Sequence, residues 1–457
     1  MTREEVIQLI DNQKSAQDNE KLRNYFSDFN NIQSNRNTIV FYVSGRTGTS
    51  VFRLEAQMFA IYKLTNEFNL VYTEQLPPSL VNLAELLIIH RASDKGYEVE
   101  NVLKCWASDK IKPFVIHNVD DNESILPKSH PLYSVWKMNN RDKQSIHSLR
   151  NSDAVEITTH KLKQYCLNHN KNTFISRNQF NWKNPQWNLT KKRPIQEFIT
   201  NATEEQIKHF EFPENWNEKI VINWAGLTSH FNDLEKMAPI MKALHDKYSN
   251  VVFCIAGMAL KDSYIEVDQA TGKMTEKPIP IEQTYRYRVT ELFKGFEPER
   301  LRVFDALQTE EYGWFFSLSD LGMVFVEHNT FNQCKSEIKA VEYLKYKSIP
   351  VISKFGGYED LYDILLKEGK FSPQLLDKFF TKSEFDPHEW VQRFSNLIDG
   401  FYTEEQQKAA EELSVFCTQF WDIDSSIANR LSIYKNFIEK NIENQEVAIQ
   451  NLQFEFA

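Results

Sequence analysis

The segment Glu327–Tyr343 carries the strongest chemical pattern in the 457-residue chain. Lys335 and Ser336 are predicted to start a helix, where free backbone N–H groups and the helix dipole favour a phosphate group. Glu342 comes seven residues after Lys335, which is about 10 Å along a helix at ~1.5 Å per residue. A carboxylate there could accept hydrogen bonds from two ribose hydroxyls while the lysine neutralises a diphosphate. The spacing therefore predicts nucleotide binding.

A solvated helix face is the alternative interpretation of this segment. Lys335 and Lys339 stand four residues apart, a spacing that is common on exposed faces. That interpretation explains the lysines but not Glu342, which shares its side of the helix with Ile338 and Val341.

Two turns that follow strands and precede helices are further candidates for ligand contact. One is Trp224–His230, with Gly226, Ser229 and His230, and the other is Ser44–Ser50, with Gly45, Arg46, Gly48 and Thr49. Free N–H groups at such helix starts could face an anion or a sugar hydroxyl. Neither P-loop spacing nor GxGxxG is present. An ordinary strand–helix turn is therefore the alternative for Ser44–Ser50.

Polar side chains also stand at the ends of two predicted strands. His90 and Arg91 end one strand and His117 ends the next, so both histidines are expected to face one crevice, unless they are structural. Asp120 and Asp121 follow directly. Their carboxylates could bind a divalent cation or a sugar hydroxyl, and a solvated turn is the alternative.

Short apolar strands alternate with amphipathic helices along most of the chain, which is typical of parallel sheets. Strands are predicted at 38–43, 69–73, 85–90, 113–117, 154–157 and 173–176, and again at 220–224, 251–256, 302–304, 321–325 and 349–353; helices are predicted at 50–64, 98–107, 158–167, 233–248 and 335–346. Residues 178–217 lack periodicity and contain three prolines, so they separate the two series.

The fold class is therefore α/β, with two Rossmann-like domains that face each other across a cleft and a helical C-terminal region. We expect a helical preface at 1–36, domains at 37–205 and 206–425, and a C-terminal helix at 426–457 that returns to the first domain. A polar stretch at 261–280 is predicted to be a surface insertion. Ligands of parallel sheets bind at the carboxyl ends of the strands, where the candidate residues stand.

Composition narrows the class of protein. Hydrophobic residues make up 41% and charged residues 25%, and no apolar run approaches the ~20 residues that cross a bilayer. Met1–Ile10 lacks the apolar core of a secretory signal, so a cytoplasmic location is expected. The five cysteines are scattered without a CxxC pair, which argues against a disulfide framework or a thiolate metal site.

The net charge of −10 is unevenly distributed. Residues 101–200 hold 16 basic and 8 acidic side chains, whereas residues 201–457 hold 27 basic and 42 acidic ones. A polyanion would therefore be drawn to the first half of the chain.

Taken together, these motifs resemble retaining glycosyltransferases of the GT-B class, of the glycosyltransferase family 4 type. That branch carries a W-A-G-x-x-S-H-x-x-D turn and an F-N-x-x-K-S-x-x-K-x-x-E-Y helix, which stand here as Trp224 to Asp233 and Phe331 to Tyr343. Segments Ile116–Asp121, Ser152–Thr159 and Ile349–Ser353 agree in the same order, so the resemblance covers roughly residues 38–360. Cys334 departs from the family, because many members have a glutamate there.

The resemblance implies a nucleotide-sugar donor in the second domain, a UDP-sugar first, an acceptor in the first domain, and transfer with retention. It implies catalytic roles for Lys335, His117 and Asp120, donor binding by Gly226, Ser229, His230, Asn332, Lys335, Ser336 and Glu342, and a cleft lined by Gly45, Arg46, Gly48, Thr49, His90 and Arg91. The departing diphosphate can take the acceptor's proton, so no metal or other cofactor is required.

The charge distribution favours an anionic acceptor. Lys191, Lys192 and Arg193 interleave with Trp182 and Trp187, a pattern that suits a phosphate backbone and unstacked bases. DNA bearing hydroxymethylated cytosine, the substrate of phage DNA glycosyltransferases, is therefore the first acceptor to consider, and the host cytoplasm would then be the location. A polysaccharide, a lipid-linked glycan, a basic surface without a partner, and a non-catalytic nucleotide-sugar-binding protein are the alternatives. An oxidoreductase would need the missing GxGxxG.

Overall fold

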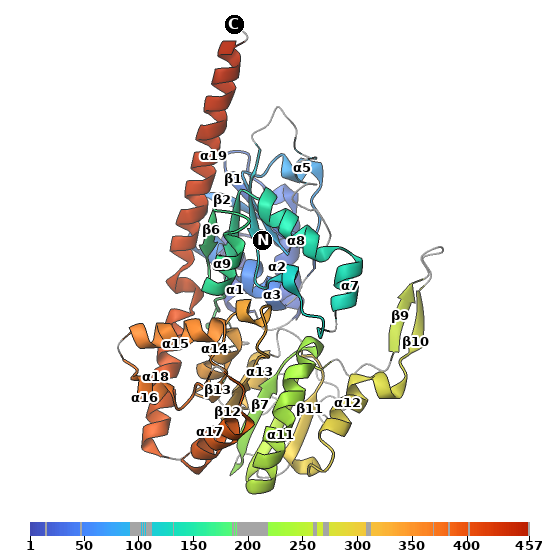
Figure 1. The fold of residues 1–457 in the computed structure, drawn as a ribbon. Helices are drawn as coiled ribbons and strands as arrows, with labels where there is room; N and C mark the ends of the chain where they lie inside the picture. The colour runs from blue at the N-terminus through green and yellow to red at the C-terminus, as the bar shows by residue number, and fades with distance from the viewer. Residues whose placement is uncertain are drawn as a thin grey trace. The chain divides into compact units, whose positions relative to one another are not determined.

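The computed structural model divides the chain into two compact units, each built from separate segments (Figure 1). The first unit comprises Met1–Asn188, Asn329–Ser336 and Thr418–Ala457, and the second comprises Leu189–His328 and Glu337–Cys417. The structure describes residues 1–13, 16–45, 48–91, 102, 104, 106, 112–130, 132–184, 187, 189, 218–258, 263–267, 274–307, 312–368, 370–382, 384–400 and 403–455.

The first unit contains a six-stranded parallel sheet. Its strands are β1 (Asn37–Val43), β2 (Phe68–Thr73), β3 (Leu86–His90), β4 (Phe114–Asn118), β5 (Ala154–Ile157) and β6 (Thr173–Ile175), in the order β2-β1-β3-β4-β5-β6. The register pairs Val43 with His90, His90 with Asn118, and Asn118 with Glu156. These four residues therefore meet at one edge of the sheet. All six strands predicted in this half are confirmed.

Helices cover both faces of this sheet. Those of the first unit are α1 (Arg3–Asp11), α2 (Ala16–Ser27), α3 (Gly48–Ser50), the π-helix η2 (Val51–Glu55), α4 (Ala56–Leu64), α5 (Pro78–Val81), α7 (Tyr133–Met138), α8 (Arg141–Asn151), α9 (His160–Cys166) and α19 (Ile427–Glu455), with 3-10 turns η1 (Phe29–Asn31), η4 (Glu123–Ile125), η11 (Asn332–Cys334) and η12 (Ile423–Ser425). Alternate residues of β1 belong to different cores, since Ile39 and Phe41 pack with α1, α2, α4 and α19, and Val40 and Tyr42 pack with α5.

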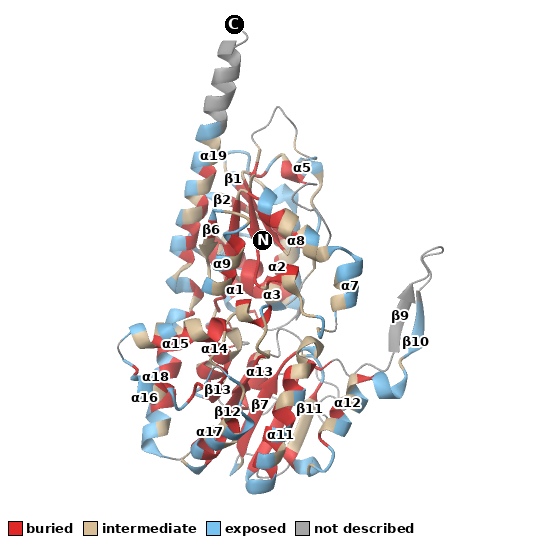
Figure 2. Ribbon diagram, viewed as in Figure 1, coloured by how far each residue is buried: buried red, intermediate tan, exposed pale blue. Residues whose placement is uncertain are grey.

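Helix α19 supplies part of this core although it lies far away in sequence. Ile427, Leu431, Tyr434 and Ile438 recur at helical spacing and are buried against the same cluster as Ile39. The burial of the strands and of one side of α19 is visible in Figure 2.

The second unit contains a five-stranded parallel sheet in the order β11-β8-β7-β12-β13. Its strands are β7 (Ile220–Ala225), β8 (Val251–Ala256), β11 (Leu301–Phe304), β12 (Leu321–Val324) and β13 (Ile349–Ile352), and β9 (Ser263–Val267) and β10 (Met274–Pro278) form an antiparallel hairpin. Its helices are α11 (Phe231–Lys247), α12 (Tyr285–Leu292), α13 (Tyr312–Ser317), α14 (Ile338–Lys345), α15 (Gly357–Lys367), α16 (Pro373–Leu376), α17 (Pro387–Asp399) and, mostly, α18 (Glu404–Phe420), with turns η7 (Thr228–His230), η8 (Ile281–Gln283) and η9 (Pro298–Arg300). The hairpin falls within the predicted insertion.

Both sheets have doubly wound orders, so the α/β prediction of two Rossmann-like domains with a helical C-terminal region is confirmed. The direction in which strands are added reverses between β1 and β3 in the first unit and between β7 and β12 in the second. Ligands of such sheets bind outside the carboxyl ends of the strands at this switch point. No described helix is both long and apolar enough to span a bilayer.

One predicted helix boundary is wrong. Helix α14 starts at Ile338 rather than Lys335, because Lys335 has an extended backbone and closes η11 with a hydrogen bond to the Asn332 carbonyl. Glu337 is the N-cap residue of α14. Lys335 and Ser336 therefore precede the helix instead of forming its first turn.

Candidate functional site

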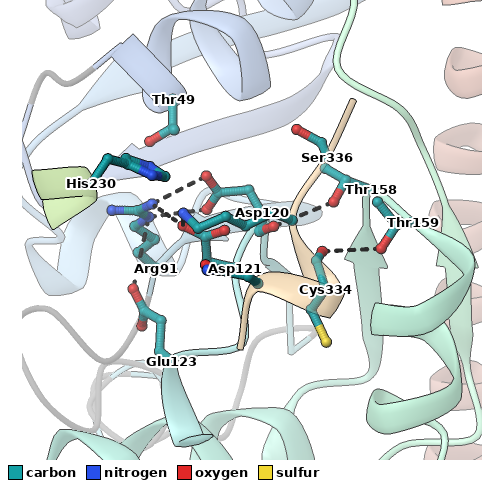
Figure 3. Close-up of polar contacts among 12 residues, drawn as sticks. Thr49, Arg91, Asp120, Asp121, Glu123, Thr158, Thr159, His230, Cys334 and Ser336 are labelled. Carbon is teal, nitrogen blue, oxygen red and sulfur yellow. Dashed lines mark hydrogen bonds and ion pairs between the residues drawn. The ribbon is translucent and has the colours of Figure 1, made fainter. Parts of the chain in front are cut away.

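Arg91 stands at the switch point of the first unit, where several charged side chains surround it. It follows β3 with a φ of 50°, a left-handed conformation that non-glycine residues rarely adopt. Its Nε and Nη2 donate to the carboxylate of Asp120 at 3.0 and 3.1 Å. The carboxylates of Asp121 and Glu123 lie 3.5 and 3.7 Å from the same guanidinium (Figure 3). One cation thus faces three carboxylates.

The pKa shifts of this pair have electrostatic causes. Burial acts to lower the pKa of Arg91, but Asp120, Glu123 and Asp121 outweigh it and raise that pKa well above its ordinary value. Burial acts to raise the pKa of Asp120, but Arg91 holds it below its ordinary range. Asp120, predicted to be catalytic, is therefore a paired anion whose basicity is low.

His90 lies beside this ion pair in a fixed hydrogen-bonding arrangement. Its Nδ1 is 3.1 Å from Asn118 Oδ1, and its Nε2 is 3.4 Å from Thr49 Oγ1. Asn118 Oδ1 also accepts from Arg53 Nε at 3.0 Å, so it is an acceptor and His90 Nδ1 carries the proton. Burial lowers the pKa of His90 to about 4, which keeps the ring neutral at pH 7. Nε2 is therefore an acceptor available to a hydroxyl.

A buried polar network below the sheet edge supports this arrangement. Asn118 Nδ2 donates to Glu156 Oε2 at 2.9 Å, which fixes the orientation of the amide. Glu156 is fully buried, accepts from Tyr434 at 3.1 Å and forms an ion pair with Arg430 at 2.6 Å. Arg53 also donates to the Ser176 carbonyl.

Sequence reasoning missed Arg53, Glu156 and Arg430. Arg53 lies in the π-helix η2, a type of turn that often marks functional sites, and burial lowers its pKa to about 10. An arginine within the apolar run from Val51 to Leu54 was a signal for it. No comparable signal pointed to Arg430, whose partner Glu156 is distant in sequence.

His117, the other histidine predicted for the crevice, belongs to the core. It is the penultimate residue of β4 and pairs in register with Ile89 and Val155. Burial lowers its pKa to about 3, so it is neutral. A neutral, buried strand residue suits packing better than proton transfer.

The segment Asn329–Ser336 belongs to the first unit. Cys334 Sγ accepts from Asn122 Nδ2 at 3.8 Å. The Cys334 carbonyl accepts from Thr159 Oγ1 at 3.1 Å (Figure 3). Burial raises the pKa of the Cys334 thiol to about 11, so it supplies no charge in place of the family's glutamate.

The two polar residues after Cys334 have partners in the first unit. Lys335 Nζ lies 3.4 Å from Asp121 Oδ2, and Ser336 Oγ accepts from Asn178 Nδ2 at 2.9 Å. Asn332 is buried in η11, and its backbone N–H donates to Asn329. The positive charge of Lys335 is therefore balanced by the carboxylate of Asp121.

The turn after β1 is only partly described. Gly48 begins α3, and a Cβ added at Gly45 or Gly48 would meet no atom within 4 Å, so packing does not require either glycine. Arg46 lies outside the described residues. Thr49 remains as the residue of this turn that contacts His90.

Two glycines shape the switch point of the second unit. A Cβ at Gly226 would lie 2.5 Å from the Trp224 ring. Gly257 has a φ of +104°, and a Cβ there would lie 2.6 Å from the Gly226 carbonyl oxygen. The backbones after β7 and β8 can approach this closely only because both residues lack a side chain.

Hydrogen bonds join the turn after β7 to the segment after β12. His230 Nδ1 is 2.7 Å from Asp233 Oδ2, and Asp233 Oδ1 accepts from the Glu327 backbone N–H at 2.8 Å. Lys236 Nζ is 3.1 Å from the Glu327 carboxylate. Ser229 is half-buried in η7. These contacts fix both loops that flank the β7–β12 switch point.

Glu342 is a buried carboxyl group on α14, the helix that follows β12. It is 3% exposed, and burial raises its pKa to about 8 although Lys339 opposes the shift. Within the described chain no donor hydrogen-bonds to this carboxyl group. Its charge also contributes to the raised pKa values of four tyrosines, the half-buried Tyr312 and the buried Tyr343, Tyr346 and Tyr358, after burial itself.

The two tryptophans of the predicted acceptor surface are buried in the structure. Trp182 and Trp187 are buried, and Trp182 stacks on Phe180 with ring centroids 4.0 Å apart, so the prediction that they stack on bases is wrong. Apolar packing against Phe52 and Phe180 accounts for both indoles. Lys191, Lys192 and Arg193 lie outside the described residues.

The carboxylates after β4 converge on an arginine. Within the described ranges no group of three or more His, Cys, Asp or Glu side chains is arranged to hold a metal ion. Asp120 and Asp121, for which a divalent cation or a sugar hydroxyl was the hypothesis and a solvated turn the alternative, face Arg91 together with Glu123.

Comparisons with known proteins find no matching family model and no matching curated protein. Solved structures do resemble the chain. The catalytic domain of starch synthase IV from Arabidopsis thaliana, bound to ADP and acarbose, is 12% identical, with 78% of this chain and 73% of that chain covered and a TM-score of 0.49. MnaA of S. aureus with UDP is 9% identical, with 88% and 97% covered and a TM-score of 0.49. An alpha,alpha-trehalose 6-phosphate synthase from Burkholderia multivorans is 10% identical, with 79% and 72% covered and a TM-score of 0.46. These likenesses assign no role to any residue, and the fold class rests on the strand orders.

Proposed function

We propose that the protein is a glycosyltransferase whose second unit binds a nucleotide sugar, with a UDP-sugar as the first donor to test. The observation that carries this proposal is Glu342, a buried carboxyl group without a hydrogen-bond donor on the helix after β12. A buried polar group without a partner costs free energy, and two ribose hydroxyls are donors that would remove that cost. The family resemblance of Phe331–Tyr343 supports the same role.

The other residues proposed to bind the donor are Gly226, Ser229 and His230 of the second unit, and Asn332, Lys335 and Ser336 of the segment Asn329–Ser336, which belongs to the first unit. Backbone N–H groups near Gly226 and Ser229 suit phosphate or sugar oxygens, and His230 is oriented by Asp233. For Lys335, a donor diphosphate would replace the carboxylate of Asp121 as its counter-ion, with Ser336 beside it and Asn332 preceding them. Lys335 would then have a negatively charged partner both with and without the donor.

We infer that transfer proceeds with retention and with the acceptor in the first unit. The bond between the anomeric carbon and the diphosphate oxygen breaks, the acceptor oxygen bonds to the same face, and the acceptor's proton passes to the departing diphosphate. Lys335 stabilises the charge that develops on the diphosphate. His90 Nε2 and Thr49 orient a hydroxyl, with Arg91 and Asp120 as the neighbouring polar pair; His117 supports them from the core.

Calorimetry with UDP and UDP-sugars tests the donor site. Glu342→Gln should weaken binding about 10- to 100-fold, because it removes the charged acceptor of two hydroxyl hydrogen bonds. Glu368→Gln, which changes an exposed glutamate at the C-cap of the next helix, α15, is the matched control and should bind as the wild type. Equal affinity in Glu342→Gln and the wild type would remove the main support for the proposal.

The acceptor is proposed to be anionic because residues 101–200 carry twice as many basic as acidic side chains. Hydroxymethylated DNA remains the first acceptor to test, although charge alone now supports it, since Trp182 and Trp187 are buried. Sugar transfer to hydroxymethylated but not plain duplexes would establish it. Transfer only to a polysaccharide or lipid-linked glycan would replace DNA.

A nucleotide-sugar-binding protein without catalysis is the second candidate. Cys334 favours it, because its buried neutral thiol replaces a family carboxylate. Donor binding without release of nucleoside diphosphate, across all of these acceptors, would establish this candidate.

A further inference from the structure

A cavity of about 460 Å³ lies in the first unit, away from the ends of β1, β3 and β4. It is formed by β6 and the residues after it, by the end of α18, and by the start of α19. The volume falls within the ~300–1,000 Å³ typical of small-molecule sites. None of the residues predicted from the sequence to bind donor or acceptor lines it.

Arg430 provides a buried cation in the wall of this cavity. It is 4% exposed and pairs with the Glu156 carboxylate at 2.6 Å. Its Nε and Nη1 have no hydrogen-bond acceptor in the described part of the chain. A guanidinium offers five N–H donors, so most of its hydrogen-bonding capacity is unused.

Arg430 shares its carboxylate partner with a second arginine. Among the described residues Glu156 faces both Arg430 and Arg53, and Asp120 also acts on Arg53. Arg177 also lines the cavity, and no aspartate or glutamate is among the described residues that line it. Asp424, close in sequence to the lining residues, is paired with Lys183 at 2.6 Å. The cavity therefore favours an anion.

Further lining groups suit an organic phosphate. Ser426 Oγ has no hydrogen-bond partner in the described chain, and it lines the cavity with the amide of Asn429. Phe174 and Phe420 add apolar wall for a compact organic part. A phosphate monoester has three terminal oxygens, which can accept hydrogen bonds from the unpaired N–H groups of Arg430 and from Ser426 Oγ.

We propose that this cavity is a second binding site of the protein and that its ligand is a small phosphorylated molecule. The phosphate accepts hydrogen bonds from Arg430 and Ser426 while Arg430 keeps its contact with Glu156. None of its lining residues is assigned to the donor or acceptor, although Arg430 also belongs, through Glu156 and Asn118, to the network that supports His90.

Titration calorimetry on the full chain tests this site with ribose 5-phosphate, and with ribose as the neutral counterpart. Ribose 5-phosphate should bind with an affinity that falls as salt is added, and ribose should not bind. Ser426→Ala and Arg177→Gln should each weaken binding about 5- to 20-fold, and Arg430→Gln about 100-fold. Lys440→Gln removes the same charge from an exposed position of α19 and should leave the affinity unchanged.

Two controls keep the test decisive. Arg430→Gln leaves Glu156 with one fewer partner and can impair folding, so the two rim variants, Ser426→Ala and Arg177→Gln, decide the outcome if it does. Lys335→Ala should not change binding, which separates this site from the proposed diphosphate ligands. The proposal is overturned if ribose 5-phosphate does not bind at millimolar concentration, if both rim variants bind as the wild type, or if only Lys335→Ala loses binding.

Discussion

The switch points of the two sheets differ in whether their polar groups have hydrogen-bonding or charged partners. In the first unit Arg91 faces three carboxylates, and His90 has a partner for Nδ1 and a fixed tautomer. In the second unit Glu342 is buried with no donor among the described residues, and its pKa is raised to about 8. The first arrangement is complete without a ligand, whereas the second would gain hydrogen-bond donors from the ribose hydroxyls proposed to bind there. Stability given up at one position is a common mark of a binding site.

The largest expected effect is a change of the free energy of unfolding with pH, caused by the ionisation of Glu342. Its pKa is about 8 in the folded protein against an ordinary value of 4.5, so the folded state holds a proton that the unfolded state releases. Its contribution to the free energy of unfolding should therefore be lost as pH rises from ~4.5 to ~8, by about 4–5 kcal/mol at ~1.4 kcal/mol per unit.

Urea unfolding at several pH values measures this effect as the difference between the wild type and Glu342→Gln. The variant lacks the titrating group, so it should be the more stable of the two at pH 8 and close to the wild type at pH 5. A difference that stays constant over this range would show that Glu342 is ionised in the folded protein, and the contrast between the two units would disappear.

The next largest effect is a loss of stability when Arg91 is removed from the three carboxylates that it faces in the first unit. Arg91→Met leaves Asp120, Asp121 and Glu123 without their shared cation and should lower the free energy of unfolding by about 3 kcal/mol. The value is at the lower end for buried pairs because the Arg91 side chain is 23% exposed.

Lys137→Met is the matched control, because Lys137 pairs with Asp142 on the surface, and it should leave the free energy of unfolding nearly unchanged. Denaturant unfolding at pH 7 gives both values. Similar losses in the two variants would mean that the Arg91 cluster is no more stabilising than a surface ion pair.

The smallest expected effect is the release of a proton when the nucleotide binds. At pH 7 Glu342 is mostly protonated, and ribose hydroxyls that donate to it favour the ionised form. Binding of UDP should therefore release up to about one proton at pH 7, and affinity should rise between pH 6 and 8.

Calorimetry in buffers of different ionisation enthalpy measures the proton released. Glu342→Gln should release less, since it has no proton to lose at this position. Release by the variant equal to that of the wild type would assign the proton to another group.

The parts of the fold that follow from local patterns could be predicted. Apolar strands followed by polar turns located both sheets, and they placed His90 and Gly226 at strand ends and Glu342 on the helix after β12. The start of α14 could not be predicted, because Lys335 is held extended by a 3-10 turn whose Cys334 packs against distant residues. The burial of Trp182 was missed for a related reason, since a mixed basic and aromatic stretch does not reveal which side chains pack together.

The rest of the candidate site depends on contacts between distant segments. Lys335 and Asp121 are 214 positions apart, and Tyr434 and Glu156 are 278 apart. Hydrophobic periodicity carries no information about such pairs. It predicts that a strand or helix is buried but not which remote side chain neutralises a buried charge.

Helix α19 has a consequence for how the protein folds during synthesis. The first unit is mostly translated by Asn188, but its core and the partner of Glu156 come from residues 427–438. Roughly 250 further residues must be made first, which takes ~12–50 s at ~5–20 residues per second. During that interval Ile39 and Phe41 lack part of their cover and Glu156 lacks Arg430. The second unit's sheet can therefore complete on the ribosome before the first unit does, and the unfinished first unit is the stage at which a nascent chain would engage chaperones.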